Sequence, residues 1–488
     1  MSATYYITTL GCPKNQADSR EMERSLRRRG LRKAADATSS DFHLINSCSF
    51  IESARVETIQ TVMEAAGLKR SGSEQKLILA GCFSERYSAA VRDELPEVDL
   101  SFGTGLYHRA GEIIGDRFDL PGRIQGDQAP GAAELIGLRQ NEDVADDLGA
   151  SHTPFAAVKI SDGCNRGCAF CAIPGFRGAF RETPREEIVA ECRQLAREGV
   201  REICLVSQDT NQYGGSPQGF IELLEELHAI PELHWIRLLY LYPDPRTEQL
   251  WEGIVERDLV WSDPLAGALS AAASGVAGAG GGRGKIVPYF ESPVQHVSAP
   301  VLRAMRRYGD AEKFLKLFAK IRGLVPNVEI RTSLLLGYPG ETEADIEAVL
   351  RFITEARPEK LALFSYSPEE GTPGYAAGDP IDAETKAGRI NEVRLAHLDV
   401  LRELHRERVG RRVRCMVDQI EPGSGRIVAR RAQDAPEVDE VVFVETEAAE
   451  VATAPAENEL QVGDLLDVEL TGFYEYDMTG TRIGSSTT

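Results

Sequence analysis

The chain has 488 residues, of which 42% are hydrophobic, so it is a globular protein too long for one hydrophobic core. It carries 55 Lys and Arg against 76 Asp and Glu, and the resulting formal charge of −21 disfavours free nucleic acid as a partner. The sequence has no run of about 20 apolar residues and no signal-peptide pattern at its start, which predicts a cytoplasmic protein with no membrane partner.

The first predicted domain, residues 1–120, alternates strand-like and helix-like segments. Three apolar runs, at 5–10, 42–45 and 76–80, have the length and composition of short strands. Helical patterns such as 17–29 lie between them. This alternation predicts an α/β domain with a parallel sheet.

Each of these three strands is followed, within two or three residues, by a cysteine: Cys12, Cys48 and Cys82. Ligands gather at the carboxyl ends of parallel strands, so the three thiols can converge on one metal cluster. The alternative is that they are ordinary buried cysteines, which are common in protein cores. Three thiols at equivalent strand ends favour the cluster.

Residues 121–150 are rich in Gly, Ala, Asp and Gln and have weak periodicity, which predicts a linker with one short helical stretch. From 151 to 400, strand candidates alternate with helical segments, which predicts a barrel-like α/β domain. The strand candidates of this second domain are 155–160, 202–207, 235–240, 328–336 and 360–366.

A second group of cysteines follows the first strand of that domain. Residues 163–171 read GCNRGCAFC and contain Cys164, Cys168 and Cys171. A loop with this spacing can place three thiolates around one 4Fe-4S cube, whose fourth iron is then free to bind a small molecule. The alternatives are a zinc site or a chance cluster. Zinc usually takes four ligands, often from two C-x-x-C pairs, and no second pair follows.

Other residues of the second domain also stand at strand ends. Gln208 and Asp209 follow 202–207 and are candidates for the mouth of the barrel, where loop residues reach a substrate. Their alternative role is a turn or a helix cap. Gly337 and Gly340 follow another strand and would let the backbone approach a bound cofactor closely. The remaining cysteines lie in apolar contexts and are predicted core thiols: Cys192, Cys204 and Cys415.

A helical pattern at 383–409 leads into the last predicted domain, 405–480, an all-β module. Between Arg431 and Arg482 there is no Lys or Arg, whereas Asp and Glu are frequent. This stretch predicts an acidic surface that repels nucleic acid and suits a cationic protein; the alternative is a solvated surface with no partner. The strand candidates of this module are 413–418, 441–446, 465–470 and 472–476.

The two cysteine triads together resemble the methylthiotransferases, a family of radical S-adenosylmethionine (SAM) enzymes, over nearly the whole chain. The resemblance implies a partial (β/α) barrel in the second domain and a TRAM-like third domain. It also implies SAM on the open iron of the cluster and an electron donor of flavodoxin or ferredoxin type. Its implied cofactor-binding residues are Phe170, Gly337 and Gly340, and its implied ligands of two 4Fe-4S clusters are Cys12, Cys48 and Cys82, and Cys164, Cys168 and Cys171.

Four segments resemble the branch of this family that modifies the β-carbon of an aspartate in a small-subunit ribosomal protein, free or on the ribosome. They are 11–15 (GCPKN), 207–210 (SQDT), 235–240 (WIRLLY) and 366–372 (YSPEEGT). The branch that acts on a modified adenosine in transfer RNA typically has Asn where Asp209 stands, and it remains the alternative. A third hypothesis, from a different class, is a two-cluster electron carrier without substrate chemistry.

Two features depart from the family pattern. Residues 266–284 form an Ala, Gly and Ser run that resembles an inserted flexible tether. Glu291 and Ser292 stand where the family tends to have Asp and Ile. These departures concern local detail, and we expect the fold to be kept.

Overall fold

The computed structural model describes residues 2–69, 74–120, 153–265, 284–421, 426–445 and 460–483. The predicted linker and all but the last residue of the predicted tether lie outside these ranges.

The chain divides into two compact units. The first joins the N-terminal part of the chain to two later stretches, Ser161–Arg181 and Ser367–Ala376. The second contains the remaining described residues.

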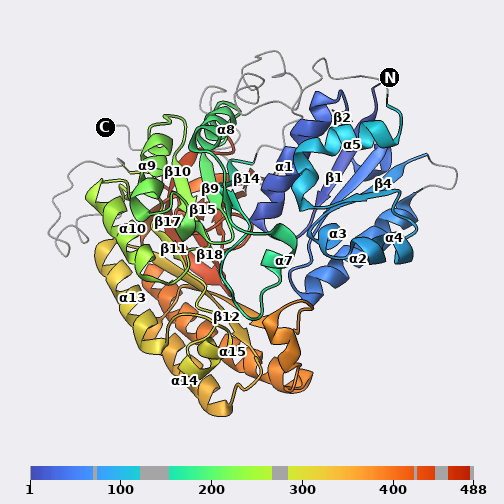
Figure 1. Ribbon diagram of the computed structural model, residues 1–488. Coiled ribbons are helices and arrows are strands. Elements are labelled where there is room, and N and C mark those ends of the chain that lie inside the picture. Colours follow the sequence, from blue (N-terminus) through green and yellow to red (C-terminus); the bar gives the residue numbers. More distant parts are fainter. Residues whose placement is uncertain are drawn as a thin grey trace. The chain divides into compact units, whose positions relative to one another are not determined.

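The N-terminal part of the first unit is a parallel sheet in the order β2-β1-β3-β4-β5 (Figure 1, blue). The central strand β3 is buried along its whole length, as expected for a strand covered on both faces. Thr9 pairs with Asn46 and Ser47 with Gly81, so the carboxyl ends of three neighbouring strands lie level. The strands are β1 (Thr4–Thr9), β2 (Arg32–Lys33), β3 (Phe42–Ser47), β4 (Lys76–Gly81) and β5 (Leu100–Phe102).

Helices cover both faces of this sheet. Alternate residues of β3 point to opposite faces, so Leu44 packs with Met22 and Leu26 of one helix while Ile45 packs with Val62 of another. The predicted parallel α/β domain is therefore confirmed. The helices are α1 (Pro13–Arg28), α2 (Glu52–Leu68), α3 (Cys82–Arg86), α4 (Ser88–Glu94) and α5 (Ala110–Arg117).

The second unit begins with six parallel strands in two sheets, β6-β9-β10 and β11-β12-β13. A parallel bridge between Ile236 and Ile286, and a hydrogen bond from Leu241 N to Glu291 O (3.2 Å), connect the two sheets. The predicted partial barrel is confirmed. Its strands are β6 (Phe155–Lys159), β9 (Glu202–Val206), β10 (Trp235–Leu238), β11 (Tyr289–Glu291), β12 (Glu329–Leu336) and β13 (Lys360–Ser365).

The helices that follow these strands pack against them through one continuous apolar core. Among the described helices, none combines the length and the apolar content needed to cross a bilayer. The helices of this part are α8 (Arg185–Arg197), α9 (Pro217–His228), α10 (Pro245–Glu256), α12 (Ala299–Ala304), α13 (Ala311–Leu324) and α14 (Glu343–Ala356).

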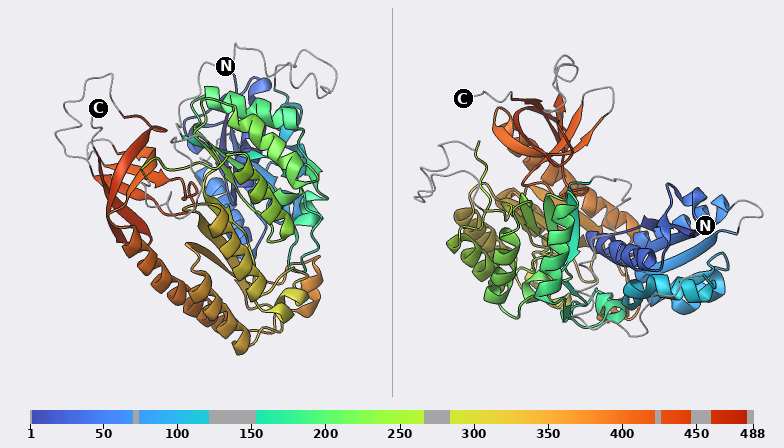
Figure 2. Two further views of the ribbon diagram at one scale, coloured as in Figure 1. Left: turned by 90° about the vertical axis from the view of Figure 1, so that its left-hand side faces the viewer. Right: turned by 90° about the horizontal axis from the view of Figure 1, so that it is seen from above.

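A long helix, α15 (Ala383–Arg408), leads into a small closed barrel in the order β14-β15-β16-β18-β17 (Figure 2, red). The two strands predicted at 465–470 and 472–476 are one strand, β17, with a bulge between Leu470 and Gly472. Strands β15 and β18 were not predicted; β18 has Met478 as its one large apolar residue, so it shows no alternation. The strands are β14 (Arg412–Ile420), β15 (Ile427–Arg431), β16 (Val442–Glu445), β17 (Leu465–Tyr474) and β18 (Asp477–Arg482).

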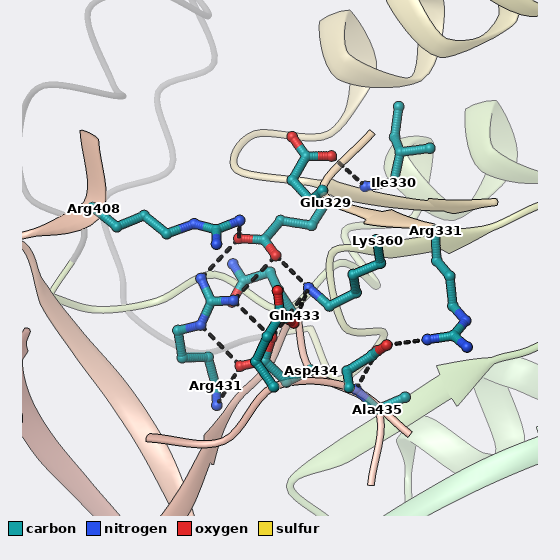
Figure 3. A network of polar contacts seen from close by, with 12 residues as sticks. Glu329, Ile330, Arg331, Lys360, Arg408, Arg431, Gln433, Asp434 and Ala435 are labelled. Atoms are coloured by element: carbon teal, nitrogen blue, oxygen red, sulfur yellow. Dashed lines mark hydrogen bonds and ion pairs between the residues drawn. The ribbon is translucent and has the colours of Figure 1, made fainter. Parts of the chain in front are cut away.

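A buried network of charges connects this small barrel to strand β12 (Figure 3). The Glu329 carboxylate lies 2.5 Å from Lys360 Nζ and 2.8 Å from a guanidinium nitrogen of both Arg408 and Arg431. Burial alone would raise the pKa of Glu329, but these three cations hold it well below its usual value. Asp434 lies 2.6 Å from Arg431 and 3.1 Å from Lys360, and Glu440 lies 3.2 Å from Lys360, so several carboxylates together compensate the positive charge at this junction.

Part of the predicted acidic surface lies inside this network, so that prediction was partly wrong. Asp434 and Glu440 are buried, and Asp439 forms an ion pair with Arg331. The acidic residues of this stretch that are exposed in the described part of the chain are Glu437, Glu445, Asp464 and Glu475.

Candidate metal centre

The cysteines of the first triad lie at one edge of the N-terminal sheet. Cys12, Cys48 and Cys82 follow β1, β3 and β4, which are neighbouring strands with level carboxyl ends. The predicted placement at three equivalent strand ends is therefore what the structure has.

Two glycines allow the backbone to approach this edge closely. Gly11 and Gly81 have positive φ angles of +88° and +102°, which residues with a side chain rarely adopt. A Cβ on Gly11 would lie 2.9 Å from Cys48 Sγ, and one on Gly81 would lie 2.6 Å from Asn46 Oδ1. Glycine is therefore required next to Cys12 and Cys82 for the strand ends to come this close.

The donor set at this edge suits an iron–sulfur cluster. Cys48 and Cys82 are only 8% and 5% exposed, and burial raises the pKa of the Cys82 thiol to about 12. Metal binding requires thiolates, whose negative charge is not stabilised by water when they are buried. A bound cluster with a cationic core would stabilise that charge instead. Within the described ranges, no three His, Cys, Asp or Glu side chains are close enough to hold a single metal ion. A 4Fe-4S cube instead spreads its ligands over several irons.

The second triad lies on a tight loop of the same unit. Cys164 N donates to Gly178 O (3.2 Å), and Cys164 Sγ accepts a hydrogen bond from Arg166 N (3.3 Å). Gly163 has φ +76°, and a Cβ there would lie 2.2 Å from Ala179 O. The loop therefore closes on itself around Cys164, and Cys168 and Cys171 follow in its next turn.

This loop packs against the N-terminal part of the unit through helix α7 (Ile173–Arg177). Phe176 forms a small apolar cluster with Cys82, and its carbonyl accepts a hydrogen bond from Thr104 Oγ1 (3.1 Å). Arg177 Nη2 lies 3.3 Å from Cys82 Sγ. The six predicted ligand cysteines are therefore carried by one compact unit.

The last segment of this unit is anchored by a buried carboxylate. Glu369 accepts hydrogen bonds from Arg55 Nη1 (2.5 Å) and Arg86 Nη1 (2.7 Å). Gly374 N donates to Ala169 O (2.6 Å) in the cysteine loop. Glu369 of the branch-specific segment YSPEEGT thus binds two arginines, and Gly374, two residues after that segment, binds the cysteine loop.

Sequence reasoning did not identify Arg177 or Glu369. Glu369 stands in a segment that the resemblance had already marked, and that was the available signal. Arg177 has no such signal, because Asp18, the nearer of its two carboxylate partners, is 159 residues away in the sequence.

The predicted substrate-mouth residues follow β9, in the second unit. Asp209 is buried and accepts from Gln212 Nε2 (2.8 Å), and its side chain makes no helix-capping hydrogen bond. The next residue, Thr210, donates through N to Tyr240 O (3.2 Å). Two of the branch-specific segments, SQDT and WIRLLY, therefore lie side by side at the ends of β9 and β10. The role of Gln208 and Asp209 stays a prediction.

One residue of the WIRLLY segment has a structural role. Arg237 is fully buried, and its Nε donates to Glu202 (2.7 Å) while Arg430 of the small barrel binds the same carboxylate (2.8 Å). This segment therefore helps to hold the two parts of the second unit together.

The two predicted cofactor glycines differ in their surroundings. Gly337 has φ +80°, and a Cβ there would lie 2.5 Å from Lys386 Cγ, so Lys386 packs where the side chain would be. Gly340 has φ +91° and nothing within 4 Å of that position. A place in cofactor binding stays a prediction for both glycines and for Phe170, which is half-buried in the cysteine loop.

Three family models match the chain. The uncharacterized protein family UPF0004 matches residues 4–103, the radical SAM superfamily matches 158–261, and the TRAM domain matches 409–483. These matches fall on the N-terminal sheet, the cysteine loop with the first barrel strands, and the small closed barrel.

Full-length relatives confirm the predicted family and branch. The chain is 43% identical to "Ribosomal protein uS12 methylthiotransferase RimO" of Leptospira biflexa, covering 98% of this chain and 97% of that protein. Proteins of the same name from Anaeromyxobacter sp. (strain Fw109-5) and Aquifex aeolicus are each 34% identical, covering 97% of this chain and 92% and 96% of theirs. The chain belongs to the RimO family of radical SAM methylthiotransferases.

Proposed function

We propose that this protein transfers a methylthio group to the β-carbon of an aspartate in the small-subunit ribosomal protein uS12. The observation that carries the proposal is the pair of cysteine triads on one compact unit, in a chain that is 43% identical to a uS12 methylthiotransferase over nearly its full length. Such a pair suits a reaction that needs both a radical and a sulfur donor.

The two cysteine triads would form two separate cofactor sites. Cys164, Cys168 and Cys171 would hold a 4Fe-4S cluster whose open iron takes SAM, and the other triad would hold a second cluster. When bound and reduced by an electron donor of flavodoxin or ferredoxin type, the first cluster and SAM supply the radical that activates a carbon with no useful acidity. Gln208 and Asp209 would contact the substrate at the mouth of the barrel, and the buried strands would exclude water.

Replacing Cys12, Cys48 and Cys82 by alanine should eliminate the methylthiolated product while leaving SAM cleavage largely intact. These thiols would hold the sulfur-donating cluster, whereas the other triad would make the radical. Anaerobic reaction with uS12, followed by mass spectrometry of its peptides and quantification of 5′-deoxyadenosine, measures both outcomes. Cys192→Ala, at a fully buried core thiol, is the matched control and should keep both activities.

Two results would contradict this proposal. Normal methylthiolation by the triple variant would show that Cys12, Cys48 and Cys82 have only a structural role. Modification of transfer RNA and not uS12 by the wild-type protein would place the activity in the other branch of the family.

We also propose that the hairpin between β17 and β18 is part of the docking surface for uS12. Tyr474 and Tyr476 are 76% and 42% exposed there, and the exposed Glu475 lies between them. Exposed aromatic and acidic side chains suit a cationic protein partner, because tyrosine adds contact area while the carboxylates steer association.

Changing Glu475 to lysine and Tyr474 to serine should slow association with uS12 roughly tenfold at low salt. The effect should shrink at physiological salt, where charges are screened over roughly 8 Å. Association rates measured by biolayer interferometry at two salt concentrations test this expectation. Glu94→Lys, an equal charge change on an exposed helix of the first unit, is the control. Equal rates for the hairpin variant and the control at both salts would rule out the docking surface.

A further inference from the structure

Arg177 is a buried charge in contact with a thiol of the first triad. It is the last residue of α7, six positions after Cys171, and is only 4% exposed. Its Nη2 lies 2.7 Å from Asp18 Oδ2, 3.1 Å from Asn15 Oδ1 and 3.3 Å from Cys82 Sγ, and its Nη1 lies 3.2 Å from Asp162 Oδ1.

The position of this guanidinium links the two triads. Arg177 is held by the loop that carries Cys164 to Cys171, yet its donor nitrogen points at the sulfur of Cys82 from the other triad. Asp18 is fully buried and fixes the guanidinium in this orientation. A change of position in the cysteine loop would therefore change the hydrogen bond to Cys82.

We infer that Arg177 sets the reduction potential of the cluster held by Cys12, Cys48 and Cys82, and this inference rests on the proposed function of that triad. Reduction adds one electron to a cluster and makes it more negative. A fixed positive charge and a hydrogen bond to a ligand sulfur both stabilise the reduced form. Arg177 is thus a positioning and electrostatic residue, acting through Cys82.

The buried carboxylate of Asp18 allows the direction of the shift in reduction potential to be tested. Asp18 lies beside the same guanidinium, so its negative charge opposes reduction while Arg177 favours it. Removing one charge or the other should move the potential in opposite directions. A residue that only holds the fold would not produce this pattern.

The experiment uses the full chain carrying Cys164→Ala, Cys168→Ala and Cys171→Ala, so that one cluster remains. After anaerobic reconstitution, iron content is measured first, and a redox titration is then followed by visible absorption and electron paramagnetic resonance. A parent protein without about four irons would contradict the proposed function of the remaining triad, whatever Arg177 does.

With the cluster present, Arg177→Met should lower the reduced-to-oxidised ratio at a fixed potential at least about tenfold, which is about 59 mV for a one-electron couple. Asp18→Asn, which keeps the shape of the side chain, should raise that ratio. Arg181→Met, at an exposed arginine four residues after Arg177, is the control and should leave it unchanged.

The inference is overturned if Arg177→Met leaves the ratio within twofold of the parent, or if both substitutions shift it in the same direction. If Arg177→Met does not retain a cluster, the reduced-to-oxidised ratio of Asp18→Asn alone tests the inference. An unchanged or lowered ratio in that isosteric variant then overturns the inference.

Discussion

Replacing Cys164, Cys168 and Cys171 together by alanine is expected to reduce the iron content of the reconstituted protein from about eight atoms to about four. The same variant should form no 5′-deoxyadenosine, because the open iron that takes SAM would be lost with its cube. The loop around Cys164 is closed by its own backbone contacts, so the three side chains can be removed with little effect on the loop's path. Iron analysis and chromatographic assay of SAM products measure the two losses.

The matched control is again a cysteine outside the triads. Cys204→Ala removes a buried thiol of strand β9 and should leave both the iron content and SAM cleavage near wild type. An unchanged iron content in the triple variant would contradict the assignment of this loop as a cluster site.

The second large effect concerns the buried junction of the second unit. Glu329→Gln should destabilise the protein by about 3–5 kcal/mol, because it removes the carboxylate that Arg408 binds and one of the carboxylates shared by Lys360 and Arg431. The urea concentration at the unfolding midpoint, followed by circular dichroism, measures the loss. Glu312→Gln is the control: its partner Lys316 is on the surface, with both side chains more than 70% exposed, and such pairs contribute about 0–1 kcal/mol.

This junction also predicts a dependence on pH. The pKa of Glu329 in the folded protein lies well below its usual value, so its stabilising contribution is present at neutral pH and is lost as the pH falls through the folded-state pKa. The difference between wild type and Glu329→Gln should therefore be full at pH 7 and shrink in acid. Equal unfolding midpoints of the two proteins at pH 7 would contradict the role given to this carboxylate.

The parts of the molecule that could be predicted from the sequence are those set by local patterns. Apolar runs followed by a glycine or polar turn located β1, β3 and β4, and the cysteines after them are level because the strands are parallel neighbours. Strand β18, by contrast, reads DMTGTR, and its inward positions are filled by Met478 and Gly480, which give no apolar alternation.

The exposure of the charged residues was the hardest property to predict, because many of them form ion pairs with residues that are distant in the sequence. Asp439 counted as part of an acidic stretch, yet it pairs with Arg331, which is 108 residues earlier. Arg431 likewise binds Glu329 from 102 residues away. A count of charges along the chain cannot distinguish a carboxylate in solvent from one inside such a junction.

The discontinuity of the first unit constrains the order in which it can be completed during synthesis. Its sheet is built from the first residues to leave the ribosome, but Arg177 and Glu369, which neutralise its buried charges, come much later. At roughly 5–20 residues per second, Glu369 emerges roughly 10–50 s after residue 120. Until each partner emerges, the nascent sheet holds the Asp18 carboxylate without Arg177, and for longer the Arg55 and Arg86 guanidiniums without Glu369. A fragment that stops at residue 120 would keep this incomplete state permanently, so the first unit is completed only late in translation.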